Sequence, residues 1–114
     1  MKDRELYDLL EAYYREGEFN SLLIKPKAWF SENGCRCPIT HVLISEGLLS
    51  EQALLDSIRR NGNQFTECIA PIISFNGAHG EFTSAFDKNE NVESALKIYK
   101  QYIDILEGKD GQEI

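Results

Sequence analysis

Apolar residues recur along this chain at intervals of three and four, the spacing that places side chains on one face of an α-helix. The first stretch carries this pattern at five positions, Leu6, Leu9, Leu10, Tyr13 and Tyr14. Gly17 follows, where a residue with a left-handed backbone typically ends a helix. We therefore expect a helix over about residues 3–16.

The middle of the chain predicts a helical hairpin. Pro38 is suited to the first position of one helix, and Gly47 stops it. Ser50 caps the next helix, and Arg59 and Arg60 lie at its end, where the helix dipole favours cations. The sequence does not decide the secondary structure of residues 21–34, although we expect Trp29 and Phe30 to fill the core.

Helical spacing returns after residue 63 but is interrupted by Pro71, which predicts a break near Ala70. Residues 74–80 are rich in glycine, and we expect a turn with positive φ at Gly77 and Gly80. Asn91 then caps a final helix that runs to about Leu106. Seven residues of that helix are expected to face inward: Val92, Ala95, Leu96, Tyr99, Tyr102, Ile103 and Leu106.

The pattern contains no convincing alternating strand, which favours an all-α fold, a compact irregular bundle of four to five short helices. A chain of 114 residues is long enough for one core. We expect a single helical domain over residues 1–107 and a flexible tail over 108–114. The alternative is an α+β fold with a small hairpin between residues 63 and 90.

The net charge of −7 lies mainly at the two ends of the chain, while the middle is balanced. Such a surface repels phosphate backbones and anionic membranes, so we expect neither direct nucleic-acid binding nor membrane binding. No apolar run approaches the roughly 20 residues of a membrane span. An odd number of cysteines, three, fits thiols in a reducing compartment, which predicts a cytoplasmic protein.

Residues 34–41 gather two cysteines and a histidine, and a zinc site is one interpretation of them. Its ligands would be Cys35, Cys37 and His41, with Cys68 or His79 as the fourth. The spacing is not that of a zinc finger, and free cysteines are often buried. We therefore favour no metal and no cofactor, and keep the zinc site as the alternative.

A thiol enzyme is the second interpretation of the same cluster. Cys37 would be the nucleophile, its thiol pKa lowered by the helix that begins at Pro38. His41 would be the base, and Asp87 or Asn89 would orient it. A 13.0 kDa helical chain leaves little room for a cleft beside its core, so we expect no enzymatic activity.

Three segments together resemble an uncharacterised family of small helical proteins. They are Cys37-Pro-Ile-Thr-His-Val-Leu after an upstream tryptophan, Phe86-Asp-Lys-Asn, and Val92-Glu-Ser-Ala-Leu-Lys-Ile. The family pairs a Trp-Cys-(small)-(hydrophobic)-Gly-Ala helix with a downstream Trp-Asn-Asp turn. The resemblance implies the architecture and a helix that bears a cysteine, and it implies no catalytic activity.

Protein binding remains as the predicted function. Aromatic residues beside acidic ones suit a docking patch with a charged rim, and an acidic surface suits a basic partner. The candidate contacts are Tyr7, Glu11, Tyr14, Phe82 and Glu93, with Phe19 as a further aromatic that we expect to be partly exposed. By size and charge the chain is similar to inhibitors from mobile elements and to immunity proteins. Its oligomeric state is not indicated.

Overall fold

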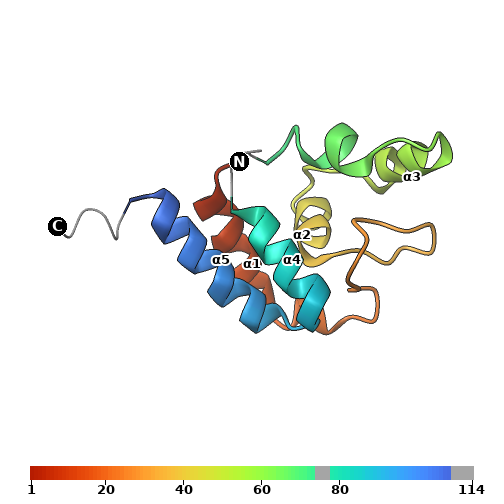
Figure 1. The fold of residues 1–114 in the computed structure, drawn as a ribbon. Coiled ribbons are helices and arrows are strands. Elements are labelled where there is room, and N and C mark those ends of the chain that lie inside the picture. Colours follow the sequence, from red (N-terminus) through yellow and green to blue (C-terminus); the bar gives the residue numbers. More distant parts are fainter. Residues whose placement is uncertain (74–77, 109–114) are drawn as a thin grey trace.

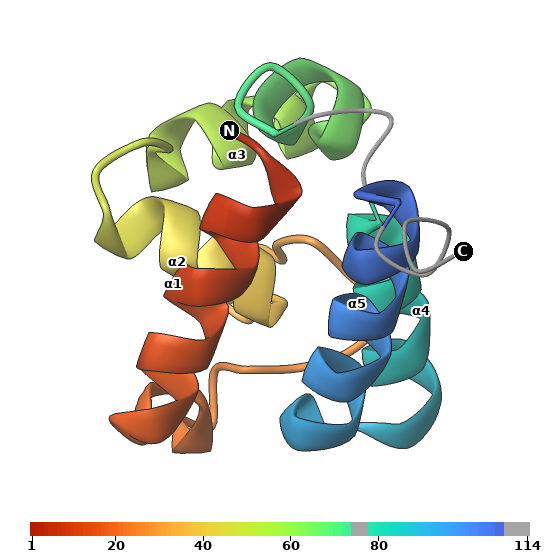
Figure 2. The ribbon, with the colours of Figure 1, turned by 90° about the vertical axis from the view of Figure 1, so that its left-hand side faces the viewer.

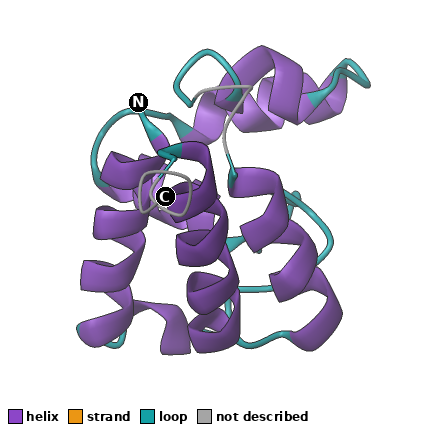
Figure 3. Ribbon diagram, turned by 60° about the vertical axis from the view of Figure 1, so that its left-hand side comes forward, coloured by secondary structure: helices purple, strands orange, loops and turns teal. Residues whose placement is uncertain are grey.

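The computed structural model describes residues 1–73 and 78–108, which form an all-α bundle. The main helices are α1 (Asp3–Arg15), α2 (Pro38–Ser45), α3 (Glu51–Arg59), α4 (His79–Asn89) and α5 (Val92–Leu106). A 3₁₀ turn, η1 (Glu18–Asn20), follows α1, and a π-helical turn, η2 (Phe65–Ile69), follows α3. Figure 3 shows no strand in the described part of the chain. The predicted all-α class is confirmed, and residues 63–73 and 78–90, the described part of the alternative, form no β-hairpin.

The helices are arranged around α1 and α5. α5 contacts both α4 and α1, and α2 contacts α1. Figure 2 shows α4 and α5 side by side, across from α1, and in Figures 1 and 2 α3 with η2 lies across one end. The core occupies the space between these helices. Its largest fully buried side chains include Tyr99, Phe82, Leu6, Leu10, Ile39 and Leu43. No helix of the described residues is long and apolar enough to cross a membrane.

Local signals place the helix ends as predicted. Gly17 adopts a φ of 78° after α1, and Gly47 a φ of 76° after α2. The Ser50 hydroxyl accepts a hydrogen bond of 3.0 Å from the backbone of Ala53, and the Asn91 side chain accepts one of 2.9 Å from Ser94. These caps satisfy amides that have no partner inside their helices.

The inward face of α5 is narrower than predicted. Ala95, Leu96, Tyr99 and Ile103 are buried. The prediction is wrong for Tyr102, 41% exposed, and for Leu106, which is also exposed. Each residue turns the helix by about 100°, so Tyr102 lies about 60° around the helix from Tyr99, outside the buried stripe. Leu106 lies on the side of Tyr99 but is the last residue of α5.

The predicted break near Ala70 is confirmed, because the Ala70 amide donates to the carbonyl of Phe65, a π-type bond of 2.7 Å, before the chain reaches Pro71. The predicted glycine turn is wrong at Gly80, which lies in the first turn of α4. Gly77 lies outside the described residues. The sequence assigned no helix to residues 79–89, since glycine at a helix start weakens the local signal.

Residues 21–37 are an irregular arm organised by Arg36. The Arg36 amide donates a hydrogen bond of 2.8 Å to the Leu23 carbonyl, and the Arg36 carbonyl accepts one of 2.9 Å from the Lys25 amide. The buried guanidinium of Arg36 lies 5.2 Å from the centre of the Phe30 ring. Phe30 is in the core as expected, while Trp29 is half-buried against Phe65. Of the predicted tail at 108–114, only Gly108 is among the described residues, and its φ of 75° follows α5.

Candidate functional site

The Cys37 thiol is buried at the start of α2. Its Sγ lies 3.4 Å from the Thr40 hydroxyl and accepts a bond of 3.5 Å from the Thr40 amide, so it acts as the cap of the helix. Burial raises the pKa of this thiol, and the hydrogen bonds from Thr40 only partly oppose the rise. The prediction of a lowered pKa is therefore wrong, because burial removes water from the thiolate and raises the pKa by more than the hydrogen bonds at the helix start lower it.

The predicted catalytic group is not assembled. The Nε2 of His41 lies 3.2 Å from a carboxylate oxygen of Glu18, and its ring packs edge-on against Tyr13 and Phe19. The Asp87 carboxylate instead accepts a bond of 2.7 Å from the amide of Lys27. Asn89, the alternative orienting residue, is exposed at the end of α4. His41 and Asp87 thus contact two different segments, the 3₁₀ turn η1 and the irregular arm.

The predicted zinc ligands also have separate surroundings. Cys35 is half-buried in the irregular arm, the Cys68 thiol donates to the carbonyl of Ala53 at 3.7 Å, and His79 stacks on Phe65. Within residues 1–73 and 78–108, no three His, Cys, Asp or Glu side chains are grouped so as to hold a metal ion.

A cavity of about 70 Å³ borders Cys37. Lys27, Ala28, Trp29, Thr83 and Asp87 form its other walls. This volume admits a few water molecules, whereas pockets for organic ligands measure roughly 300–1,000 Å³. The cavity beside the thiol is therefore smaller than a typical ligand pocket.

Tyr7 and Phe82, two of the predicted contact residues, are buried, so their expected exposure is wrong. Phe82 is 1% exposed because α4 packs it against Tyr99, at 5.9 Å between ring centres. Tyr7 is 8% exposed and meets Tyr99 edge-on at 6.0 Å. Tyr99 on α5 therefore packs against both rings, and its contact with Tyr7 joins opposite ends of the chain.

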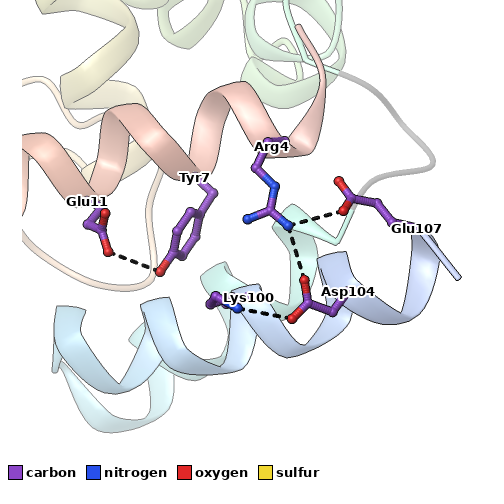
Figure 4. A network of polar contacts seen from close by, with 6 residues as sticks. All are labelled: Arg4, Tyr7, Glu11, Lys100, Asp104 and Glu107. Carbon is purple, nitrogen blue, oxygen red and sulfur yellow. Dashed lines mark hydrogen bonds and ion pairs between the residues drawn. The ribbon is translucent and has the colours of Figure 1, made fainter. Parts of the chain in front are cut away.

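Glu11 is used inside the protein. Figure 4 shows it accepting a bond of 3.3 Å from the Tyr7 hydroxyl, and it also lies 3.6 Å from Arg15. In the same view, Arg4 bridges Asp104 and Glu107 at 3.1 Å each. The Arg4 contacts join α1 to the end of α5, whereas the contacts of Glu11 lie within α1 and leave it less available to a partner.

Tyr14 and Glu93, the two remaining predicted contacts, line one groove of about 240 Å³. Tyr14, Phe19 and Asn20 form one wall, and Glu90, Asn91, Val92 and Glu93 form the other. Figure 2 shows why they meet: the end of α1 and the connection between α4 and α5 lie at the same end of the molecule. Tyr14 is 39% exposed. One wall is therefore aromatic and the other acidic.

The charge of the acidic wall is not neutralised by salt bridges. Across the described part of the chain, Glu90 and Glu93 form no ion pair. The start of α5 adds a partial positive charge of about half a unit, which is smaller than the two negative charges of the carboxylates. The two carboxylates therefore leave this wall of the groove with a net negative charge.

The sequence did not identify Glu90, Asn20 or Val92 as site residues. Glu90 ends α4 with a φ of 54°, a conformation that a glutamate rarely adopts and that no local signal announces. Only the packing of α5 on α1 brings these residues to the groove.

Comparisons with known proteins found no matching family model, no matching curated protein and no matching solved structure. The resemblance to small helical proteins therefore stays a prediction.

Proposed function

We propose that this chain is a non-enzymatic binding protein that takes an exposed arginine of a basic partner protein into the groove between Tyr14 and Glu93. The observation that carries the proposal is the pairing of an aromatic wall with an acidic wall in one groove. By covering a basic surface of its partner, the protein acts as an inhibitor or regulator.

Arginine fits this groove better than lysine does. A guanidinium stacks its flat face on an aromatic ring and donates two parallel hydrogen bonds to a carboxylate. Here the ring is Tyr14 and the carboxylates are Glu90 and Glu93. A lysine ammonium makes the charge contact without the stacking.

The alternatives, a thiol enzyme and a zinc protein, have less support. The thiol of Cys37 is buried with a raised pKa, and His41 is engaged by Glu18. Native mass spectrometry before and after chelator treatment tests the zinc alternative directly, because a bound ion adds its mass to the intact chain.

The experiment titrates ¹⁵N-labelled protein with the peptide Gly-Arg-Gly-Arg-Gly-Arg-Gly, acetylated and amidated, and with its lysine and glutamine counterparts. We expect saturable amide shifts around Tyr14 and Glu93 with the arginine peptide and a Kd on the order of 0.1–1 mM. The lysine peptide should bind several-fold more weakly and the glutamine peptide should not bind.

Three variants locate the interaction. Tyr14→Ala and Glu93→Gln should each weaken binding about two- to fivefold, as expected for one partly exposed contact. Glu11→Gln removes the same charge from a carboxylate that is occupied within the protein, and it should leave the Kd unchanged. An equal loss of affinity in Glu11→Gln and Glu93→Gln would overturn the proposal. Binding of the glutamine peptide as tight as that of the arginine peptide would overturn it as well.

A further inference from the structure

The outer face of the α4–α5 hairpin carries a groove of about 370 Å³, lined by both polar and apolar side chains, that is separate from the acidic groove. On α4 it is bordered by Glu81, Ser84, Ala85, Lys88 and Asn89, and on α5 by Ile98, Gln101 and Tyr102. Figure 2 shows α4 and α5 side by side at one edge of the molecule, across from α1.

Each helix contributes one regular stripe to this face. On α4, Glu81, Ser84, Ala85 and Lys88 stand at i, i+3, i+4 and i+7. On α5, Ile98 and Tyr102 are one turn apart, and Ile105 continues their stripe. Tyr102 is 41% and Ile105 55% exposed, so this edge of α5 leaves two large side chains in contact with water.

The charges on the α4 stripe are arranged to pair with a second copy. Glu81 and Lys88 are opposite in sign and seven residues apart, about 10.5 Å along the helix, too far to pair with each other. Neither forms an ion pair within residues 1–73 and 78–108. The midpoint between them falls between Ser84 and Ala85, whose small side chains allow another helix to approach closely.

We propose that this face is a two-fold interface between two copies of the chain, with α4 antiparallel to α4 of the second copy. A two-fold axis through Ser84 and Ala85 places Glu81 of each copy opposite Lys88 of the other and forms the same pair twice. Tyr102 and Ile98 then flank the crossing. The inference is independent of the arginine groove, which lies at the end of the same hairpin.

The size of the face predicts a weak dimer. α4 and α5 are 11 and 15 residues long. Two adjacent helices of these lengths present on the order of 400 Å² per copy, about half of a standard stable interface. The net charge of −7 on each copy also opposes association. We expect a dissociation constant in the range of about 10–100 µM at 150 mM salt, where distant charges are screened.

Sedimentation velocity from 5 to 500 µM tests the proposal. The wild-type chain should shift from monomer to dimer, whereas Glu81→Lys and Lys88→Glu should each raise the dissociation constant at least tenfold because like charges then meet twice. The combined swap, Glu81→Lys with Lys88→Glu, restores both pairs and should recover dimerisation.

Mixing the two single variants is the decisive experiment. In the mixed dimer both contacts are attractive, so two chains that do not self-associate should associate with each other, and this result also shows that both are folded. Glu32→Lys, an equal charge change on an exposed residue of the irregular arm, is the matched control and should leave the dissociation constant unchanged. A wild-type monomer at 500 µM, or dimerisation that ignores the swaps, would refute the interface.

Discussion

The Tyr99 hydroxyl links the first and last helices, and its removal gives a sharp test of the core. Tyr99 is fully buried on α5, and its hydroxyl donates a hydrogen bond of 2.7 Å to the side chain of Asp3 on α1. The other carboxylate oxygen of Asp3 accepts a bond of 3.0 Å from the amide of Ala78. The Asp3 carboxylate on α1 therefore binds both the Tyr99 hydroxyl of α5 and the residue that precedes α4.

Tyr99→Phe keeps the ring and deletes only the donor. A hydrogen bond to a charged group contributes about 1.5–3 kcal/mol. Asp3 is half-buried, so water replaces part of that bond, and the lower end of the range applies. We expect the free energy of unfolding to fall by about 1.5–2 kcal/mol, and the melting temperature by about 6–10 °C for a domain of this size.

Urea unfolding followed by circular dichroism at 222 nm measures this change. The slope of free energy against urea should stay constant, because the variant exposes the same surface on unfolding. Tyr102→Phe makes the same chemical change on the exposed side of α5 and should cost less than about 0.5 kcal/mol. A loss for Tyr99→Phe no larger than that of this control would refute the reasoning.

Two further predictions concern titration and thiol chemistry. Burial and the bond to Asp3 raise the pKa of Tyr99 above its usual value of 10.0. The stability that Tyr99 contributes should therefore be complete below pH 10 and decline as pH rises above it. Between pH 9 and 11 the free energy of unfolding of the wild type should fall by about 1.4 kcal/mol more than that of Tyr99→Phe, as urea unfolding would reveal. With a thiol reagent at neutral pH, Cys35 should react first while Cys37 and Cys68, which are buried and have raised pKa values, react only after denaturation; prompt modification of Cys37 would contradict the structure.

Features specified by neighbouring residues were predictable from the sequence. Gly17, Ser50 and Asn91 each act within one turn of their own position, so the sequence indicated the ends of α1, α3 and α5 correctly. The break before Pro71 is local as well. α4 was missed because its helix begins with His79 and Gly80, which give no starting signal.

Features that depend on packing between distant segments were not predictable in the same way. Whether Tyr7 is a contact or a core residue depends on α5, which lies about 90 residues further along the chain. The pKa of Cys37 depends on burial that no neighbouring residue signals. Tyr14 and Glu93 were identified singly, but only the bundle shows that they share a groove while Glu11 is engaged elsewhere.

The packing of α1 against α5 has a consequence during biosynthesis. After α1 is made, a further 91 residues, 16–106, must be polymerised before α5 is complete. At about 5–20 residues per second this takes roughly 5–18 s. Throughout that interval the apolar side of the nascent first helix lacks its permanent cover, so it is open to chaperones and to wrong associations. Translation speed, more than intrinsic helix formation, then limits how soon each new molecule is safe from aggregation.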